Sequence, residues 1–272
     1  MKSAWDTRIQ RATELSSAYP FAAEALRFYA QLAMLQQKIY SEIDRSPARF
    51  ISLTDSGWGE LNSSALLPSF SEFLKNVQRI APPALGQAAG AMTQENSASW
   101  PRLLEEFWPS PAPVHECEDL KDASVAERGL VWLFLQPFAE YLASRHRVLS
   151  DESPRRCPVC GSNPIVGVLR PEGDGAKKSL ICMLCAHEWG FRRIYCPACG
   201  EEKEPQMAFY SAAEIPHVRV DVCETCHTYL KSVDLTKTGL AVPVVDELAA
   251  LPLDLWAREK GYRKLQMNPV GL

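Results

Sequence analysis

Apolar residues recur at spacings of three and four over much of the first 150 residues, a pattern typical of amphipathic helices. The clearest example runs from Phe21 to Asp44, with charged and amide side chains largely between its apolar positions. Those apolar positions are Ala22, Leu26, Tyr29, Ala33, Ile39 and Ile43. Because the residue before a proline is biased away from helix, this long helix is predicted to end before Pro47.

Further helices are predicted in the same region, separated by segments rich in glycine or proline. They cover Pro68 to Ile80, Ala84 to Met92, a short piece within Thr93 to Pro113, and Ser124 to Arg147. The last is apolar on most of its surface, so we expect it to be the central helix of an N-terminal domain, kinked near Pro137. Gly57 and Gly59 indicate a loop from Ile51 to Asn62, and the prolines after Trp108 indicate a connector.

The second half of the chain changes to the pattern of short strands joined by turns. The predicted strands are Ile165 to Arg170, Ser179 to Cys182, Met207 to Ser211 and Val218 to Val222. In the last of these, valines alternate with Arg219 and Asp221, as expected of a half-buried strand. Glu247 to Lys264 is predicted to be a C-terminal helix, with Asp254 as its N-cap and Gly261 at its end.

Eight of the nine cysteines lie between these strands as four Cys-x-x-Cys pairs. The pairs are Cys157/Cys160, Cys182/Cys185, Cys196/Cys199 and Cys223/Cys226. Their spacing is close to that of zinc ribbons, in which two such pairs enclose one tetrahedral ion. A repeat of about 40 residues favours two sequential sites over a cross-braced arrangement. Gly161 and Gly200 follow the first pair of each copy and can take the positive φ that such a turn requires.

Together these patterns predict an α+β chain of four units. Residues 1–150 form an all-helical domain, and the polar stretch from Ser150 to Arg156 is the domain boundary. Residues 151–193 and 194–240 form two tandem four-cysteine modules of the zinc-ribbon or rubredoxin-like kind. Residues 241–272 form a C-terminal helix and a tail that packs on the body.

Structural metal ligation is the main interpretation of all eight paired cysteines, because modules of this size contain few large apolar residues. An ion contributes roughly 10–16 kcal/mol per structural site in small zinc domains, which would supply much of what such a core lacks. Four thiolates suit zinc and iron alike, so we expect two metal ions, each iron or zinc, one per site. His187 and His227 lie close to the pairs, but four sulfurs already complete each site, so neither histidine is expected to be a ligand.

Composition and charge narrow the functional classes. A formal net charge of -4 and a pI near 5.8 give no long-range attraction to a polyanion, and residues 151–231 carry 10 basic and 11 acidic side chains. The longest apolar run, Leu130 to Leu135, is far shorter than the roughly 20 residues that span a bilayer. Met1 to Gln10 lacks the apolar core of a secretory signal. We therefore expect a cytoplasmic protein, where thiols stay reduced.

Catalysis is not indicated by the sequence. We find no Ser/His/Asp, Cys/His or paired-carboxylate arrangement and no phosphate-binding glycine loop. Thiol-disulfide exchange would need one Cys-x-x-Cys at the start of a helix, whereas these pairs lie between strands and turns. A zinc-ribbon nucleic-acid binder and a rubredoxin-like electron-transfer protein remain alternatives; the first predicts affinity that falls steeply with salt, the second a visible spectrum that bleaches on reduction.

Particular residues resemble a known family. The repeated Cys157-Pro-Val-Cys160-Gly and Cys196-Pro-Ala-Cys199-Gly, the pairs that begin at Cys182 and Cys223, and the ending from Asp254-Leu-Trp to Asn268-Pro-Val-Gly are similar to FdhE, the formate dehydrogenase accessory protein family. The resemblance covers the whole chain. It implies a non-catalytic, cytoplasmic role: binding the catalytic subunit of a respiratory, molybdenum-dependent formate dehydrogenase and supporting its maturation, with iron or zinc at the cysteines.

A partner-binding surface is expected from the ribbons and the helical domain together. Trp189, Phe191 and Tyr229 lie near the cysteine pairs and are candidates for contact with the partner, because aromatic residues are enriched at binding hot spots. Packing inside the hairpins is the other interpretation of the same three residues.

Overall fold

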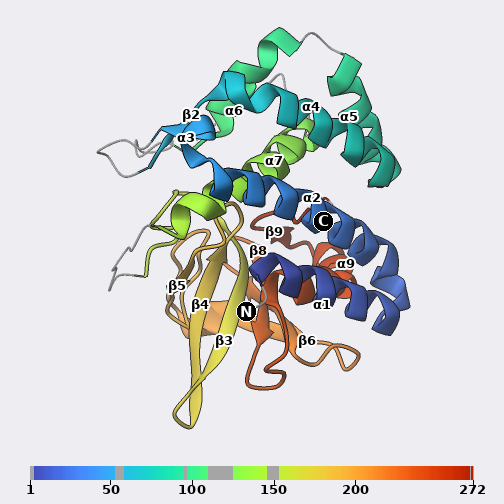
Figure 1. Cartoon of the computed structure of the whole chain (residues 1–272). Helices are drawn as coiled ribbons and strands as arrows, with labels where there is room; N and C mark the ends of the chain where they lie inside the picture. The colour runs from blue at the N-terminus through green and yellow to red at the C-terminus, as the bar shows by residue number, and fades with distance from the viewer. Residues whose placement is uncertain are drawn as a thin grey trace.

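The computed structural model describes residues 3–52, 58–94, 97–109, 125–145, 153–269 and 271. A bundle of helices from the first half of the chain lies on one side, a twisted sheet lies on the other, and α2 runs between them (Figure 1). Two further helices near the C-terminus pack beside the sheet. The predicted α+β class is confirmed: a helical N-terminal region, a β-rich part with two cysteine clusters, and C-terminal helices.

The helical region contains two helices that the sequence patterns did not reveal, α1 and the four-residue α3. The helices are α1 Ala4–Ala18, α2 Ala23–Arg45, α3 Pro47–Phe50, α4 Ser63–Ile80, α5 Pro83–Gln94, α6 Trp100–Phe107 and α7 Val125–Ala143. Helix α1 begins at a capping box in which Ser3 and Asp6 satisfy each other's backbone N–H groups. Helix α4 begins earlier than predicted because Asn62 accepts a hydrogen bond from the Ala65 N–H and caps it.

Helix α7 is the central helix, as predicted, because it contacts α2, α4, α5 and α6. Gln36 of α2 donates a hydrogen bond to the carbonyl of Leu133 at 2.7 Å. Arg8 of α1 forms a 2.8 Å ion pair with Glu140. Residues 110–124 of the proline-rich connector and residues 150–152 of the predicted boundary lie outside the described residues. The kink near Pro137 stays a prediction.

The predicted loop from Ile51 to Asn62 proves to contain a pair of two-residue strands. Strand β1 Ile51–Ser52 pairs antiparallel with β2 Glu60–Leu61. Trp108 donates from its indole N–H to the carbonyl of Gly59 at 2.7 Å, which attaches this strand pair to the end of α6. Three short 3-10 turns, Pro20–Ala22, Ser97–Ser99 and Glu204–Gln206, complete the connections.

The two cysteine modules share one seven-stranded sheet. Its strands are β3 Pro164–Glu172, β4 Gly175–Cys182, β5 Glu188–Gly190, β6 Met207–Ser211, β7 Val218–Cys223, β8 Thr228–Asp234 and β9 Arg263–Lys264. The order is β5-β4-β3-β8-β7-β6, with β9 paired to β8. Every predicted strand is present. The modules join where β3 and β8 pair in parallel; β8 also pairs in parallel with β9, and the other neighbours in this sheet are antiparallel.

A buried ion pair reinforces this joint, and its acidic member, Asp221, is less exposed than the strand pattern predicted. Lys178 of β4 donates to Asp221 of β7 at 2.7 Å, and Ser232 of β8 donates to the same carboxylate oxygen at 2.7 Å. Burial alone would raise the pKa of Asp221, but Lys178 and Arg219 lower it below its usual range. Asp221 is therefore buried, with 8% of its surface exposed, although its strand position predicted the half-exposed face.

The apolar cores do not follow the order of the chain. One core combines α3–α7 with the first cysteine cluster and the aromatic residues around it. The second combines α1, α8 and α9 with strands β3, β7 and β8. Helix α2 contributes to both cores, so it holds the helical bundle against the sheet. The predicted domain limits are not tested by this packing and stay predictions.

The C-terminal region differs from the single helix that was predicted. It forms α8 Pro243–Ala249 and α9 Leu251–Glu259, separated at Ala250. Asp254 is not an N-cap: it is fully buried in the first turn of α9 and accepts hydrogen bonds from Tyr229 and Lys264 at 2.8 and 2.9 Å. Gly261 follows the end of α9 with φ of +86°, as the prediction required.

Four buried charged residues hold α8 and α9 on the sheet. Lys231 and Lys264 each lie within ion-pair distance of Glu247 and Asp254. Burial alone would raise the pKa of Asp254, but both lysines lower it; burial lowers the pKa of Lys231. Asn268 of the tail also donates to Glu247, at 3.5 Å. The network therefore fixes the tail to the body of the molecule.

The joint between the modules predicts a specific sensitivity at Gly167. A Cβ atom there would lie 2.2 Å from Ser232 Oγ, inside a buried and well-packed sheet. We expect Gly167→Ala to lower the free energy of unfolding by about 1–3 kcal/mol, because one side of the joint must move. Gly190→Ala is the matched control, since a Cβ at that position meets nothing within 4 Å. Denaturant unfolding measures both, and equal stability of the two variants would contradict the tight joint.

Candidate metal centres

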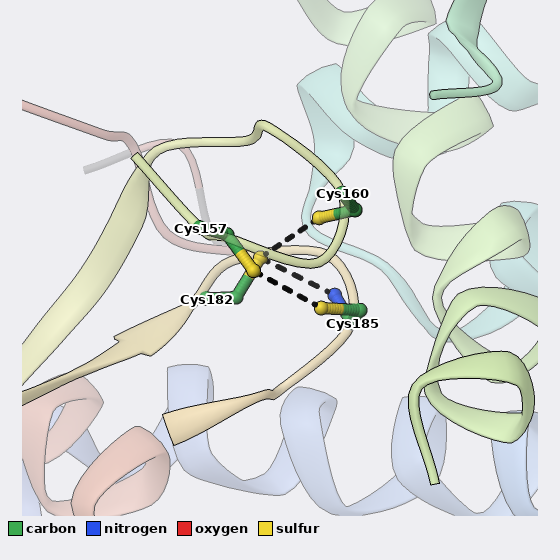
Figure 2. Close-up of side chains that lie close together, drawn as sticks. All are labelled: Cys157, Cys160, Cys182 and Cys185. Carbon is green, nitrogen blue, oxygen red and sulfur yellow. Dashed lines mark hydrogen bonds between the residues drawn. The ribbon is translucent and has the colours of Figure 1, made fainter. Parts of the chain in front are cut away.

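The eight paired cysteines come together as two clusters of four. Cys157, Cys160, Cys182 and Cys185 form the first cluster, and Cys196, Cys199, Cys223 and Cys226 form the second; within each cluster the sulfurs lie within 4.8 Å of one another. Figure 2 shows the first four side chains pointing toward a common centre from two facing turns. This is the sequential grouping that the repeat predicted.

The sulfur separations fit a tetrahedral metal site. Four sulfurs at about 2.3 Å from one ion would lie about 3.8 Å apart. In the first cluster, the sulfurs of Cys157 and Cys185 are 3.6 Å apart, and in the second cluster those of Cys196 and Cys226 are 3.8 Å apart. All eight cysteines are free thiols in this structure. The donor set thus has the size and the softness that iron or zinc prefers, and the two clusters are able to hold two ions.

The backbone of the first turn of each cluster adopts one conformation in both copies. The N–H of Cys157 donates to the carbonyl of Ser162, and the N–H of Gly161 donates back to Cys157, both at 2.9 Å. Cys196 and Gly200 make the equivalent bonds in the second cluster. Gly161 and Gly200 have φ of +73° and +83°, which is the positive φ predicted for them. The backbone of the chain therefore curls around the sulfurs through its own hydrogen bonds.

In the second turn of each cluster, the residue directly after the second cysteine is not glycine but also has a positive φ. Ala186 and His227 follow Cys185 and Cys226, and both have φ of +52°. Such values are uncommon for residues with a Cβ and persist where the surroundings impose them. The N–H of His227 donates to the carbonyl of Cys223 at 2.9 Å, which matches the bond that glycine makes in the first turn. Neither His187 nor His227 belongs to a cluster of ligand atoms.

The two clusters differ in their exposure to solvent. All four cysteines of the first cluster are buried, whereas in the second Cys199 is exposed and Cys226 is half-buried. The first cluster is covered by the helical domain: Gln136 of α7 donates a hydrogen bond to the carbonyl of Met183, between the two cysteines of the second turn. Cysteine spacing does not indicate this difference, because both modules have nearly the same spacing.

Electrostatics agree with a cation at each cluster. Removal from water is the largest influence on the thiols of Cys182 and Cys196, and it raises the pKa of both. Four thiols this close together cannot all ionise without a compensating positive charge. A bound cation would supply that charge and keep the sulfurs as thiolates.

Of the two interpretations of the three aromatic residues, packing inside the molecule is confirmed and exposure for partner contact is wrong. Trp189, Phe191 and Tyr229 are only 6%, 6% and 1% exposed. Trp189 donates from its indole to the carbonyl of Pro154 at 2.9 Å, and Tyr229 donates from its hydroxyl to Asp254. They pack inside the molecule because the helices and the tail cover the faces of the hairpins, which local sequence around the cysteines does not reveal.

The fold and the two clusters define a class: a helical domain joined to a pair of four-cysteine ribbons that share one sheet. Among the helices that the structure describes, none has the length and apolar character needed to cross a membrane. Residues 156–193 match the model of the FdhE central domain, and residues 194–270 match that of the FdhE C-terminal domain. The chain belongs to the FdhE family.

Relatives extend this match beyond the ribbons. The FdhE homolog of Pectobacterium carotovorum subsp. carotovorum is 27% identical over 99% of this chain and 87% of its own length. The FdhE homolog of Aquifex aeolicus is 37% identical over 42% of this chain and 41% of its own length. The crystal structure of FdhE from Pseudomonas aeruginosa superposes with a TM-score of 0.71 at 26% identity, covering 99% of this chain and 96% of that one.

The difference in exposure predicts that the two ions leave at different rates. A thiol-reactive or chelating reagent reaches the second cluster through Cys199, whereas the first cluster opens only when the helical domain moves away. We expect a chelator to remove one ion from the folded protein and the other only with added denaturant. Absorbance of a chromogenic chelator measures release, and alkylation followed by mass spectrometry shows which cysteines become free. Release of both ions at one rate would contradict the assignment.

Proposed function

We propose that this chain is a non-catalytic accessory protein that binds the catalytic subunit of a respiratory, molybdenum-dependent formate dehydrogenase and supports its assembly or activation in the cytoplasm. The observation that carries the proposal is the match to FdhE proteins along nearly the whole chain, which includes the helical domain as well as the ribbons. Sharing both parts supports a common role for the complete molecule rather than for the ribbons alone.

The ligands of the two proposed ions are the eight clustered cysteines, four to each ion. Each ion, iron or zinc, would supply a bond between two distant turns of the chain. In the first cluster it would tie the turn before β3 to the end of β4; in the second it would tie the turn after β5 to the end of β7. The ribbons would then present a rigid surface to the partner protein.

The buried polar groups outside the cysteine clusters support a non-catalytic role, because they pair with one another. His217 lies 2.8 Å from Asp246, but the third member of that group is Arg11, which donates to the same carboxylate at 3.0 Å, so these residues attach α1 and α8 to the sheet. A cavity of about 390 Å³ lies beside α7. Among its described lining residues, the charged groups are Arg8 and Glu140, and these pair with each other.

A pull-down from formate-respiring cells tests the proposal. The chain carrying an affinity tag should recover the catalytic subunit of formate dehydrogenase. Cys157→Ser combined with Cys160→Ser should abolish recovery, because two of the four sulfurs at the buried first cluster are lost. The matched control is Cys117→Ser, which changes the one cysteine outside the four pairs. Circular dichroism of each variant reports whether the helical domain stays folded.

Two outcomes of that experiment would count against the proposal in different ways. Failure of the unmodified chain to recover the subunit would contradict the proposed partner. Full recovery by the double variant would leave the partner in place and remove the ribbons from the mechanism.

A further inference from the structure

Strand β6 forms an open edge of the sheet in the second module. It is the last strand in the order, and within the described residues no strand pairs with its outer side. The backbone carbonyl of Gln206 accepts a hydrogen bond from the backbone N–H of Glu224 at 2.9 Å. Because backbone groups alternate in direction along an antiparallel ladder, those of residues 206, 208 and 210 face β7. The N–H and C=O groups of Phe209 and Ser211 therefore point outward, as does the C=O of Met207, whose N–H donates to the carbonyl of Glu204.

This edge lacks the features that usually protect a sheet from pairing with another chain. Such features are charged side chains, prolines, bulges and short strands. Between Met207 and Ser211 there is no charged residue, no proline and no shift in the register with β7. The opposite edge is protected: β5 has three residues, and its Glu188 forms an ion pair with Arg170.

Exposed aromatic side chains extend the open edge on both faces of β6. Phe209 is 62% exposed and Tyr210 is 42% exposed, and their side chains point to opposite faces of the sheet. The Tyr210 ring lies 4.6 Å from that of Trp256, which in turn stacks on Tyr262 at 6.4 Å. Leu255, beside Trp256 on α9, is 53% exposed. An apolar surface of this kind next to unpaired backbone groups suits a strand-shaped ligand.

The acidic residues at the two ends of the edge indicate the charge of that ligand. Glu204 lies just before β6 and Glu214 just after it; both are exposed, and among the described residues neither has an ion-pair partner. A second copy of this chain is a poor fit, because antiparallel pairing of two β6 edges would bring the turn that carries Glu204 close to the turn that carries Glu214 of the other copy. A strand with basic residues at its ends would instead meet opposite charge.

We propose that β6 is the docking edge for an extended segment of the partner protein, about five residues long, apolar in its middle and flanked by lysine or arginine. The segment adds a strand through the outward N–H and C=O groups of Phe209 and Ser211 and the outward C=O of Met207. This inference rests on the proposed function, since it places the formate dehydrogenase catalytic subunit on a particular surface. The observations that carry it are the open ladder, the exposed aromatic rings and the two unpaired carboxylates.

The second cysteine cluster holds this edge in place. Glu224, between Cys223 and Cys226, binds the start of β6 through its N–H and accepts a hydrogen bond from the Tyr262 hydroxyl at 2.6 Å. The turn that surrounds the second ion thus fixes both β6 and the aromatic row. This gives the more exposed cluster a part in partner binding that the buried cluster does not have directly.

Affinity for the purified catalytic subunit, measured with the full chain, tests the docking edge. Phe209→Lys removes the central aromatic ring and places a charge against the apolar middle of the incoming strand, and we expect binding roughly tenfold weaker or more. Phe21→Lys is the matched control, because Phe21 is also an exposed phenylalanine, at 50%, far from the sheet edge in sequence. It should leave affinity unchanged.

Hydrogen exchange resolved to single amides gives a second, independent readout. The amides of Phe209 and Ser211 should exchange rapidly in the free chain and slowly in the complex, whereas those of Ala208 and Tyr210, which face β7, should be slow in both. No binding by the unmodified chain would contradict the proposed function itself. Binding that survives Phe209→Lys with unchanged β6 amides would overturn only the docking edge, and protection that rises with concentration in the free chain would show a second copy there instead.

Discussion

The convergence of four cysteine sulfurs in each cluster, where one cation could bind, is the constraint on which the rest of this structure depends. Cys182 ends β4 and Cys223 ends β7, so each cluster fixes the base of a hairpin. The two hairpins meet where β3 pairs with β8 in one continuous sheet. Helix α8 packs across that joint, and the buried charges of Lys231 and Asp254 fix α9 on the sheet.

The same chemistry serves two different positions in the molecule. The first cluster shares an apolar core with the helical bundle and is enclosed by it. The second lies at the outer end of the sheet, with Cys199 exposed and Glu224 bonded to the neighbouring edge strand. A duplicated ribbon has therefore acquired one copy that joins the two halves of the protein and one that faces solvent. The difference comes from what packs on each copy, not from the cysteine spacing.

Much of this arrangement follows from local pattern in the sequence. The long helix predicted from Phe21 to Asp44 is α2, Ala23–Arg45. It was predictable because apolar residues at helical spacing form one continuous stripe only if the segment is a helix. The hairpin strands and the grouping of the cysteines were also predictable, since both depend on short-range spacing. Helix α1 was missed because few of its residues are buried: Trp5, Ala12, Leu15 and Ser16.

Features set by contacts between distant segments were not predictable. The parallel pairing of β3 with β8 depends on the small size of Gly167, which no local rule identifies. Asp254 looked like a helix cap because it precedes an apolar run, yet the lysines that bury it come from β8 and β9. The most direct test of the account is elemental analysis, with a count of reduced thiols, on protein purified without added metal: it predicts two ions per chain and eight metal-protected cysteines, whereas a folded chain without metal, or with these cysteines in disulfides, would contradict it.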